Sequence, residues 1–248
     1  MRLSLKDNIS LYDSIKDHDY FFTKEHNLRG EISIELISEV IDKKSKSPLK
    51  LLSIACSTGV IEEKIKNRLG IVAFGVDAAK KSLRTARKRG IITKYTDVSE
   101  PMPFKSNYFD FVFAGEIIEH IFDTKSFLNE IYRVLKPNGY LILSTPNLAR
   151  FDDRLKFLFG KTPRQVAPFH PYLYLHIRPF TFDLLKNTLN ACNFTNITLR
   201  TNVIDLNFFG KEIKIYSKLF TRLFPTFGST LIIRAQKLKN EPKNRTSV

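Results

Sequence analysis

The chain of 248 residues contains only two cysteines, Cys56 and Cys192. Two thiols cannot build a disulfide framework or a zinc site made mainly of thiolates, and we assign no residue as a metal ligand. Apolar runs such as residues 140–144 are far too short to cross a bilayer. The first residues also lack the continuous apolar stretch of a signal peptide. We therefore expect a cytoplasmic protein.

Acidic residues are scarce relative to basic ones. The sequence has 40 Lys and Arg against 25 Asp and Glu, which gives a formal net charge of +15. Such an excess favours an anionic partner, which includes nucleic acid, an acidic lipid surface and a phosphorylated substrate. A lysine-rich surface without a specific partner has the same net charge. Charge alone therefore does not choose between these classes.

Short apolar strands alternate with amphipathic helices in the first part of the chain. Strands are expected at residues 51–55, 71–76, 91–96, 109–113 and 140–144, and helices at residues 28–41, 58–69, 79–88 and 124–135. The helical segments have apolar residues at a spacing of three or four, whereas the strands are short and continuously apolar. This alternation is typical of parallel βαβ units in an open sheet.

The second half of the chain is less regular. Residues 148–174 have no strand pattern and carry three prolines, which indicates a cap inserted at about residues 148–180. Further on we expect helices at residues 181–191 and 211–224 and strands at residues 197–203 and 230–235. The fold class is therefore α/β, with a Rossmann-like seven-stranded mixed sheet, helices on both faces and an inserted cap.

Three segments make up the predicted domain organisation. Residues 1–27 form an aromatic-rich preamble that we interpret as a lid. Residues 28–238 form the main domain, which includes the cap. Residues 239–248 are polar and lack apolar periodicity, so we expect a disordered tail.

The turn after the first strand is built from small residues. Ala55, Ser57 and Gly59 allow the backbone to approach a ligand closely, and the helix that follows offers unpaired N–H groups. In open α/β sheets, ligands bind beyond the carboxyl ends of the strands. This turn is therefore the first candidate for a binding site.

Two carboxylates follow the next two strands. Asp77 lies eighteen residues after Gly59, where a carboxylate can accept hydrogen bonds from both ribose hydroxyls. Asp97 follows the third strand and is suited to an adenine amine, with the apolar Val98 beside it. A dinucleotide fingerprint needs a small residue where Val60 stands, and the sequence has no P-loop. These observations point to an adenosyl ligand that is neither a dinucleotide nor a nucleoside triphosphate.

The order of these motifs resembles the class I S-adenosylmethionine-dependent methyltransferases over roughly residues 28–205. The segments that carry the resemblance are LLSIACSTG, FGVDAA, TDVSEPMPF, FDFVFAGEIIEHI, RVLKPNGYLILSTPN and HIRPFT. The most specific part is residues 109–147. Within the family, the chain resembles the small-molecule branch, and it is similar to quinone-biosynthesis O-methyltransferases and to methyltransferases found with polysaccharide assembly. The resemblance implies S-adenosyl-L-methionine (SAM) as the cofactor.

The resemblance also implies which residues contact the cofactor. They are Ala55, Ser57 and Gly59 for the methionine and ribose, Asp77 for the ribose, Ala78 for the adenine face, Asp97 and Val98 for the adenine edge, and Ala114, Gly115 and Glu116 for the sulfonium. The family usually has Asp where Ser53 stands, near the amino-acid part of SAM, and Gly where Ala55 and Ser57 stand. We expect binding to be intact; the alternatives are weaker affinity or a non-catalytic binding module.

Methyl transfer to a hydroxyl requires removal of a proton, and few residues are placed to accept it. His120 follows Glu119 after the fourth strand, and His176 lies in or after the cap. We predict these three as catalytic residues. Glu119 and His120 could instead satisfy backbone donors at a helix start, and His176 could only brace the cap.

The expected acceptor is an oxygen of a small molecule, lipid or glycan intermediate. The chain has AGEI where methyltransferases of nucleic-acid bases carry [DNS]PP[YFW], which disfavours methylation of a base. RNA or an acidic protein is the alternative acceptor, because both suit a positive surface. Residues 148–159 and 211–224 predict two basic amphipathic helices, which either pack on the core or contact an anionic membrane at its periphery.

Overall fold

The computed structural model describes residues 23–41, 47–98, 100–166, 175–208 and 211–238. The predicted lid, apart from its last five residues, and the predicted disordered tail lie outside the described residues. The first described helix, α3 (Lys24–Ser38), begins four residues before the predicted helix. It begins there because the Thr23 side chain accepts a hydrogen bond from the backbone N–H of His26 at 3.2 Å.

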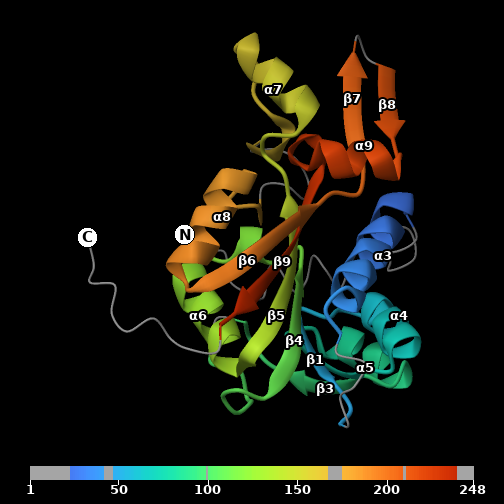
Figure 1. The fold of residues 1–248 in the computed structure, drawn as a ribbon, viewed down its shortest axis with the longest axis vertical. Helices are drawn as coiled ribbons and strands as arrows, with labels where there is room; N and C mark the ends of the chain where they lie inside the picture. The colour runs from blue at the N-terminus through green and yellow to red at the C-terminus, as the bar shows by residue number, and fades with distance from the viewer. Residues whose placement is uncertain (1–22, 42–46, 99, 167–174, 209–210, 239–248) are drawn as a thin grey trace.

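Seven strands form one sheet in the order β3-β2-β1-β4-β5-β9-β6 (Figure 1). Their bounds are β1 Lys50–Ile54, β2 Val72–Asp77, β3 Ile92–Tyr95, β4 Phe109–Gly115, β5 Leu135–Pro146, β6 Phe194–Arg200 and β9 Thr230–Lys237. The first five strands pair in parallel, and β9 is antiparallel to both β5 and β6. The prediction of a seven-stranded mixed sheet is confirmed.

Helices cover both faces of this sheet, as predicted (Figure 1). They are α3, α4 (Val60–Leu69) and α5 (Lys80–Lys88) on one face and α6 (Thr124–Val134) and α8 (Phe182–Ala191) on the other. Leu51 packs with the first group and Leu52 with the second. Successive side chains of a strand point to opposite faces, so a continuously apolar strand is buried on both.

The carboxyl ends of β1, β2, β3 and β4 lie at the same edge of the sheet. Ile54 pairs with both Val76 and Ala114, and Asp77 pairs with Tyr95. The residues that directly follow these strands therefore share that edge, which is where ligands bind in open α/β sheets.

A second group of elements projects beyond this edge, and we call it the tip (Figure 1). It comprises residues 150–161, which include α7 (Phe151–Leu158), a two-stranded sheet of β7 (Ile204–Phe208) and β8 (Lys211–Ile215), and residues 216–227 with α9 (Lys218–Leu223). Among the described residues, no helix is long and apolar enough to span a bilayer.

The prediction of one helix at residues 211–224 is wrong. Its first part is β8, which pairs antiparallel with β7, and only its second part is helical. Ile213 and Ile215 alternate with polar neighbours, a period of two that suits a strand once a partner strand is present. That partner is β7, which the predicted strand at residues 197–203 did not include. The helix predicted at residues 148–159 is present as α7.

Candidate active site

The turn between β1 and α4 has an unusual backbone. Ala55, Ser57 and Gly59 have φ angles of 54°, 46° and 77°, in the left-handed region that side chains disfavour. The Cys56 N–H donates to the Val76 carbonyl at 3.1 Å, and the Gly59 N–H donates to the Cys56 carbonyl at 2.9 Å. Strained backbone of this kind is concentrated at ligand sites. Ala55, Ser57 and Gly59 therefore lie in one tight turn, which these backbone hydrogen bonds hold at the edge of the sheet.

Asp77 is fixed against this turn. Its Oδ2 accepts a hydrogen bond from the Ser57 N–H at 2.8 Å, and its Oδ1 accepts one from the Ala79 N–H at 2.7 Å. The carboxylate is thereby oriented at the edge, with half-buried Ala78 beside it. Asp97 and Val98 follow β3, whose end is tied to β2 by the Thr96 N–H at 3.1 Å from the Asp77 carbonyl. Contact of Ala78, Asp97 and Val98 with adenine stays a prediction.

The end of β4 places one charged side chain at the edge. Ala114 is fully buried in the core, so only its backbone is available to a ligand. A Cβ on Gly115 would lie 2.8 Å from the Phe113 ring, which leaves room only for glycine. Glu116 has a φ of 54°, and its N–H donates to the Ser144 carbonyl at 2.9 Å. Of the three residues predicted to face the sulfonium, only Glu116 directs a functional group into the site.

Ser53 contacts Glu62, an acidic residue of the helix that follows β1. It is buried inside β1, and its Oγ donates a hydrogen bond of 2.6 Å to Oε1 of Glu62 in α4. Glu62 is itself buried, and this burial raises the pKa of its carboxyl from 4.5 to about 7. The sequence prediction missed Glu62, because an acidic residue in the first turn of a helix is common on solvent-exposed helices.

A buried arginine from α3 lies among the carboxylates. Arg29 forms an ion pair of 3.4 Å with Glu116, and its guanidinium donates to Nδ1 of His26 at 2.8 Å. Its charge also acts on Glu62 and Glu119, where it favours the ionised carboxylate. Burial lowers the pKa of His26 to about 3, so this imidazole is neutral and adds no charge. Neither residue was predicted in the site, because Arg29 fell on the predicted helix at residues 28–41 and His26 in the predicted lid.

Glu62, Glu116 and Glu119, which we call the site carboxylates, therefore share one arginine as a buried counter-charge. Burial raises the pKa of Glu119 well above its ordinary value, and the nearby Glu116 raises it further. Oε1 of Glu116 and Oε1 of Glu119 are buried and accept no hydrogen bond from the described residues. Among the described residues, three carboxyl groups therefore face one buried cation.

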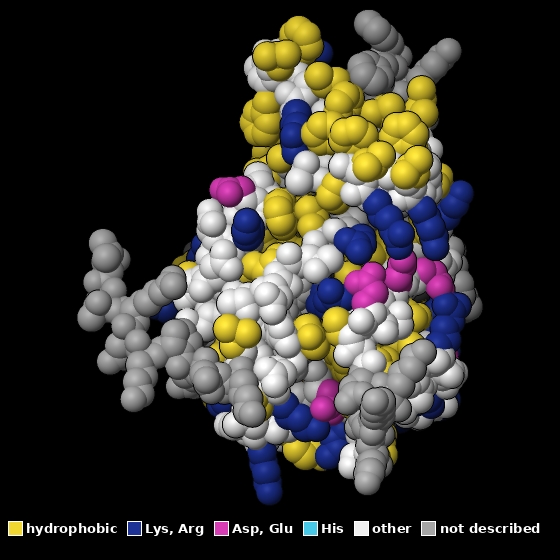
Figure 2. Space-filling view, viewed as in Figure 1, with side chains coloured by type: hydrophobic (Ala, Val, Ile, Leu, Met, Phe, Trp, Pro, Cys, Tyr) yellow, Lys and Arg dark blue, Asp and Glu magenta, His cyan; other side chains and the backbone are white. Residues whose placement is uncertain are grey.

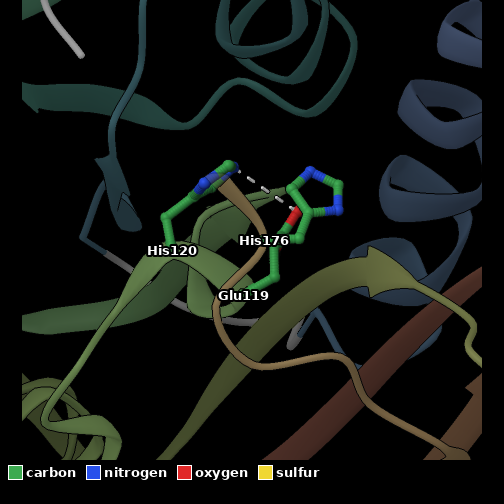
Figure 3. Close-up of side chains that lie close together, drawn as sticks. All are labelled: Glu119, His120 and His176. Atoms are coloured by element: carbon green, nitrogen blue, oxygen red, sulfur yellow. Dashed lines mark ion pairs between the residues drawn. The ribbon is translucent and has the colours of Figure 1, made fainter. Parts of the chain in front are cut away.

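Glu119, His120 and His176 come together, as Figure 3 shows. Glu119 and His120 lie on the short helix η1 (Ile118–His120), and His176 comes from the segment that precedes α8. The Glu119 Oε1 lies 3.9 Å from the His120 Nε2, and the two imidazole rings are 4.9 Å apart. One ligand atom from each residue lies within 4.8 Å of the others. We predicted the residues, but not that they form a set suited to a metal ion.

Backbone contacts hold this group in place. The His120 Nδ1 lies 3.1 Å from the Leu175 carbonyl, and the Arg178 N–H donates to the Glu119 carbonyl at 3.1 Å. Oε2 of Glu119 accepts a hydrogen bond of 3.0 Å from Thr145 at the end of β5. Burial also lowers the pKa of His120, which keeps its imidazole neutral. The contacts of Leu175 and Arg178, on either side of His176, therefore hold this histidine beside η1.

Comparison with known proteins identifies a methyltransferase domain in the chain. Residues 52–143 match the family model of a methyltransferase domain. The chain is 27% identical over 134 residues to the mitochondrial ubiquinone biosynthesis O-methyltransferase of Bos taurus, covering 50% of this chain and 36% of that protein. It is 34% identical over 138 residues to the ubiquinone biosynthesis O-methyltransferase of Pelagibacter ubique, covering 51% and 57%.

A solved structure covers more of the chain. A SAM-dependent methyltransferase of Thermotoga maritima, described as a possible histamine N-methyltransferase, superposes with a TM-score of 0.62 at 19% identity over 93% of this chain and 99% of that one. Residues 52–143 are therefore a methyltransferase domain, and the chain has the fold of the SAM-dependent methyltransferases. This methyltransferase spans 36% and 57% of the length of the two sequence relatives.

The residues of the methyltransferase fit its cofactor. SAM is a cation at its sulfonium and at its amino group, and the site carboxylates outnumber the one buried arginine among them. Glu62 places a carboxylate next to Ser53, the position where the family usually has Asp. Asp77 and the turn at residues 55–59 lie together at the edge, and their contact with the ribose and methionine stays a prediction. The departures from the family pattern therefore leave the acidic character of the site in place.

Proposed function

We propose that this methyltransferase transfers the methyl group of SAM to a hydroxyl oxygen of a small molecule, lipid or glycan intermediate. The observation that carries the proposal is the group of Glu119, His120 and His176 beside Glu116 at the end of β4. The two sequence relatives are named as O-methyltransferases, which supports an oxygen acceptor.

The reaction is an in-line displacement at the methyl carbon. The acceptor oxygen forms a bond to carbon, the carbon–sulfur bond breaks with its electron pair staying on sulfur, and the sulfonium becomes a neutral thioether. Alignment of donor and acceptor supplies at most about 7–11 kcal/mol of the barrier reduction. Removal of the hydroxyl proton adds typically about 10²–10⁴-fold in rate. The protein therefore has to hold SAM in place and to activate a hydroxyl.

Glu119, His120 and His176 have the chemistry of a divalent-cation site. Two imidazoles and one carboxylate are ligands that bind zinc, iron and similar ions. The Leu175 carbonyl holds the His120 Nδ1, which directs Nε2 toward Glu119 as an outer partner does for a metal-binding histidine. A bound divalent cation would lower the pKa of a coordinated hydroxyl.

The remaining residues have supporting roles. Asp77 and the turn at residues 55–59 hold the adenosyl part, and Glu62 with Ser53 holds the amino-acid part. Glu116, oriented by Arg29, places a negative charge beside the sulfonium. Thr145 orients the Glu119 carboxylate. These residues would hold SAM with its sulfonium near Glu116.

The experiment begins with binding. Calorimetry should show SAM binding, and Mn²⁺ should give an altered electron paramagnetic resonance spectrum that His120→Ala abolishes. Labelled SAM is then tested with catechols, lipid-linked sugars, RNA and protein as acceptors, with and without a chelator. Label on a hydroxyl compound, lost with the chelator, supports the proposal.

Other outcomes point elsewhere. Label on RNA or protein would assign the alternative acceptor. Absence of SAM binding would indicate a non-catalytic module. Activity that survives the chelator but is lost in His120→Ala would leave the histidine as a general base without a metal ion.

A further inference from the structure

The tip exposes an unusual number of large apolar side chains. At the end of α7, Leu158 is 76% exposed and Phe159 is 75% exposed. On α9, Leu219 and Leu223 are 64% and 63% exposed. Figure 2 shows that apolar side chains cover much of this end of the molecule on the viewed face. Exposed apolar patches of this kind mark interaction surfaces.

Aromatic rings join the separate parts of this surface. Phe151 in α7 is 5.3 Å from Phe227, Phe227 stacks on Phe224 at 5.7 Å, and Phe224 stacks on Phe220 of α9 at 6.4 Å. The apolar side chains of α7 and α9 therefore belong to one surface, although some 60 residues separate them in the sequence.

Charge on the tip has one sign at the surface. Its basic side chains Arg154, Lys161, Lys214, Lys218 and Arg222 are exposed. Asp152, Asp153 and Asp205, which we call the tip carboxylates, are buried. Among the tip side chains that the structure describes, the exposed charges are therefore positive. Lys214 and Arg222 pair with Glu25 and Glu35 of α3, and Arg154 donates to backbone carbonyls. Lys161 and Lys218 are therefore the tip cations that remain for an anionic partner.

We propose that the tip docks on an anionic lipid bilayer. Exposed phenylalanine and leucine side chains enter the boundary between headgroups and acyl chains, and lysines beside them contact the anionic headgroups. A second protein would need a complementary shape, whereas a fluid bilayer accepts side chains that project from two separate helices and a hairpin. The basic charge around the apolar side chains selects an anionic bilayer over a neutral one.

Because the tip lies beyond the edge of the sheet, docking would also orient the active site relative to the membrane. The chain enters α7 directly from the carboxyl end of β5, and the tip lies beyond the same edge as the active site (Figure 1). A docked tip would hold that edge toward the membrane, within reach of an acceptor with a lipid tail. Docking does not depend on methyl transfer, so its failure would leave the proposed function intact.

The absence of tryptophan from the chain allows a direct test. Phe159→Trp introduces a single reporter on the tip, and Leu184→Trp introduces one at an exposed position of α8, away from the tip. With vesicles of phosphatidylcholine and phosphatidylglycerol, the emission of the tip reporter should shift to the blue and be quenched by brominated lipid. The α8 reporter should show neither change.

Vesicle sedimentation of the full chain tests separately how the apolar and the basic side chains of the tip contribute to membrane binding. Leu219→Ser/Leu223→Ser should weaken binding to anionic vesicles by at least about tenfold, because apolar burial is lost. Ile92→Ser/Leu184→Ser is the control, since both side chains are 50% exposed but lie elsewhere. Circular dichroism and SAM binding establish that each variant is folded.

The contribution of the tip lysines to membrane binding is tested by comparing two double variants. Lys161→Gln/Lys218→Gln should weaken binding by about 25-fold, which corresponds to about fivefold for each cation removed. Lys81→Gln/Lys88→Gln removes two exposed charges from the strongly basic α5 and should leave binding unchanged.

Three results would overturn the proposal. One is equal binding to neutral and anionic vesicles. Another is equal loss in the α5 and tip variants, which would mean that net charge alone attracts the protein. The third is an unshifted tip reporter together with a dimer that Leu219→Ser/Leu223→Ser dissociates, which would make the tip an interface between two copies of the chain.

Discussion

Two groups of three carboxylates differ in the number of cations that compensate them. Among the described residues, the tip carboxylates share two cations, Arg150 and Lys156, whereas the site carboxylates share one, Arg29. Burial of a charge is tolerated when a partner with good hydrogen bonds compensates for it. The tip group therefore has the charge balance of a structural network, whereas the site group has an excess of carboxyl groups that suits a cationic ligand.

The geometry of Arg150 shows the compensation in the tip. Its Nε lies 2.7 Å from Asp152 and 3.0 Å from Asp153, and its Nη1 lies 3.2 Å from Asp205. One guanidinium therefore ties α7 to β7. In the active site no cation holds Glu62 in this way, and burial raises the pKa of its carboxyl to about 7.

The largest effect should come from Glu119→Gln. Removing this carboxylate from the group of Glu119, His120 and His176 should lower the methyl-transfer rate by about 10²–10⁴-fold. The free energy of unfolding should not fall, because Glu119 is buried without a cation of its own. Single-turnover kinetics and urea unfolding measure the two effects, with Glu63→Gln as the half-exposed control. A rate within tenfold of the wild type would contradict the assignment.

The matching change in the tip is Arg150→Ala. It leaves the tip carboxylates with only Lys156, so the free energy of unfolding should fall by about 3–5 kcal/mol. Urea denaturation measures this. Arg84→Ala, at an exposed position of α5, should stay within about 0.5 kcal/mol of the wild type. Equal effects of the two substitutions would show that the tip network is not structural.

Glu62→Gln should stabilise the protein without ligand. The pKa of Glu62 is raised in the folded state from 4.5 to about 7, so the folded protein binds this proton more tightly than the unfolded chain. Wild-type stability therefore falls as the pH rises from 4.5 to 7. At pH 8 the variant should be more stable by about 3 kcal/mol. Thermal unfolding at several pH values tests this; a variant less stable than the wild type at pH 8 would refute it.

The same residue should make SAM binding depend on pH. A cationic ligand favours the ionised carboxylate, so binding releases a proton from Glu62 below pH 7. The wild-type Kd should therefore rise by about tenfold for each pH unit below 7 and level off above it. Calorimetry should find no such slope in Glu62→Gln. A slope that persists in the variant would assign the proton to another group.

Lys156→Gln should have the smallest effect. The side chain of Lys156 is 29% exposed and contacts Asp152 and Asp153 from the rim of the tip network. Solvent weakens such pairs, so the loss should be below about 1 kcal/mol in urea unfolding. A loss as large as that of Arg150→Ala would mean that the two cations contribute equally.

The sequence predicted the helices and strands best where the buried residues recur at a regular spacing. The strands β1, β2 and β4 are apolar on both faces, and the helices between them have apolar residues at helical spacing, so their order could be predicted. Asp77 and the turn at residues 55–59 could be located because they follow strands that end at one edge. The segment at residues 211–224 failed because its strand depends on pairing with β7, a contact between segments that local pattern does not reveal.

The sequence alone was enough to predict the α/β fold, the edge of the sheet that has the candidate site and the residue types available there. Only the tertiary structure brought Arg29 and Glu62 to that edge, set His176 beside His120, and joined α7 and α9 into one exposed surface. The physical reason is that periodicity reports which face of each element is buried. Which buried charges become neighbours, and which apolar side chains stay uncovered, depends on contacts between elements that are distant in the chain.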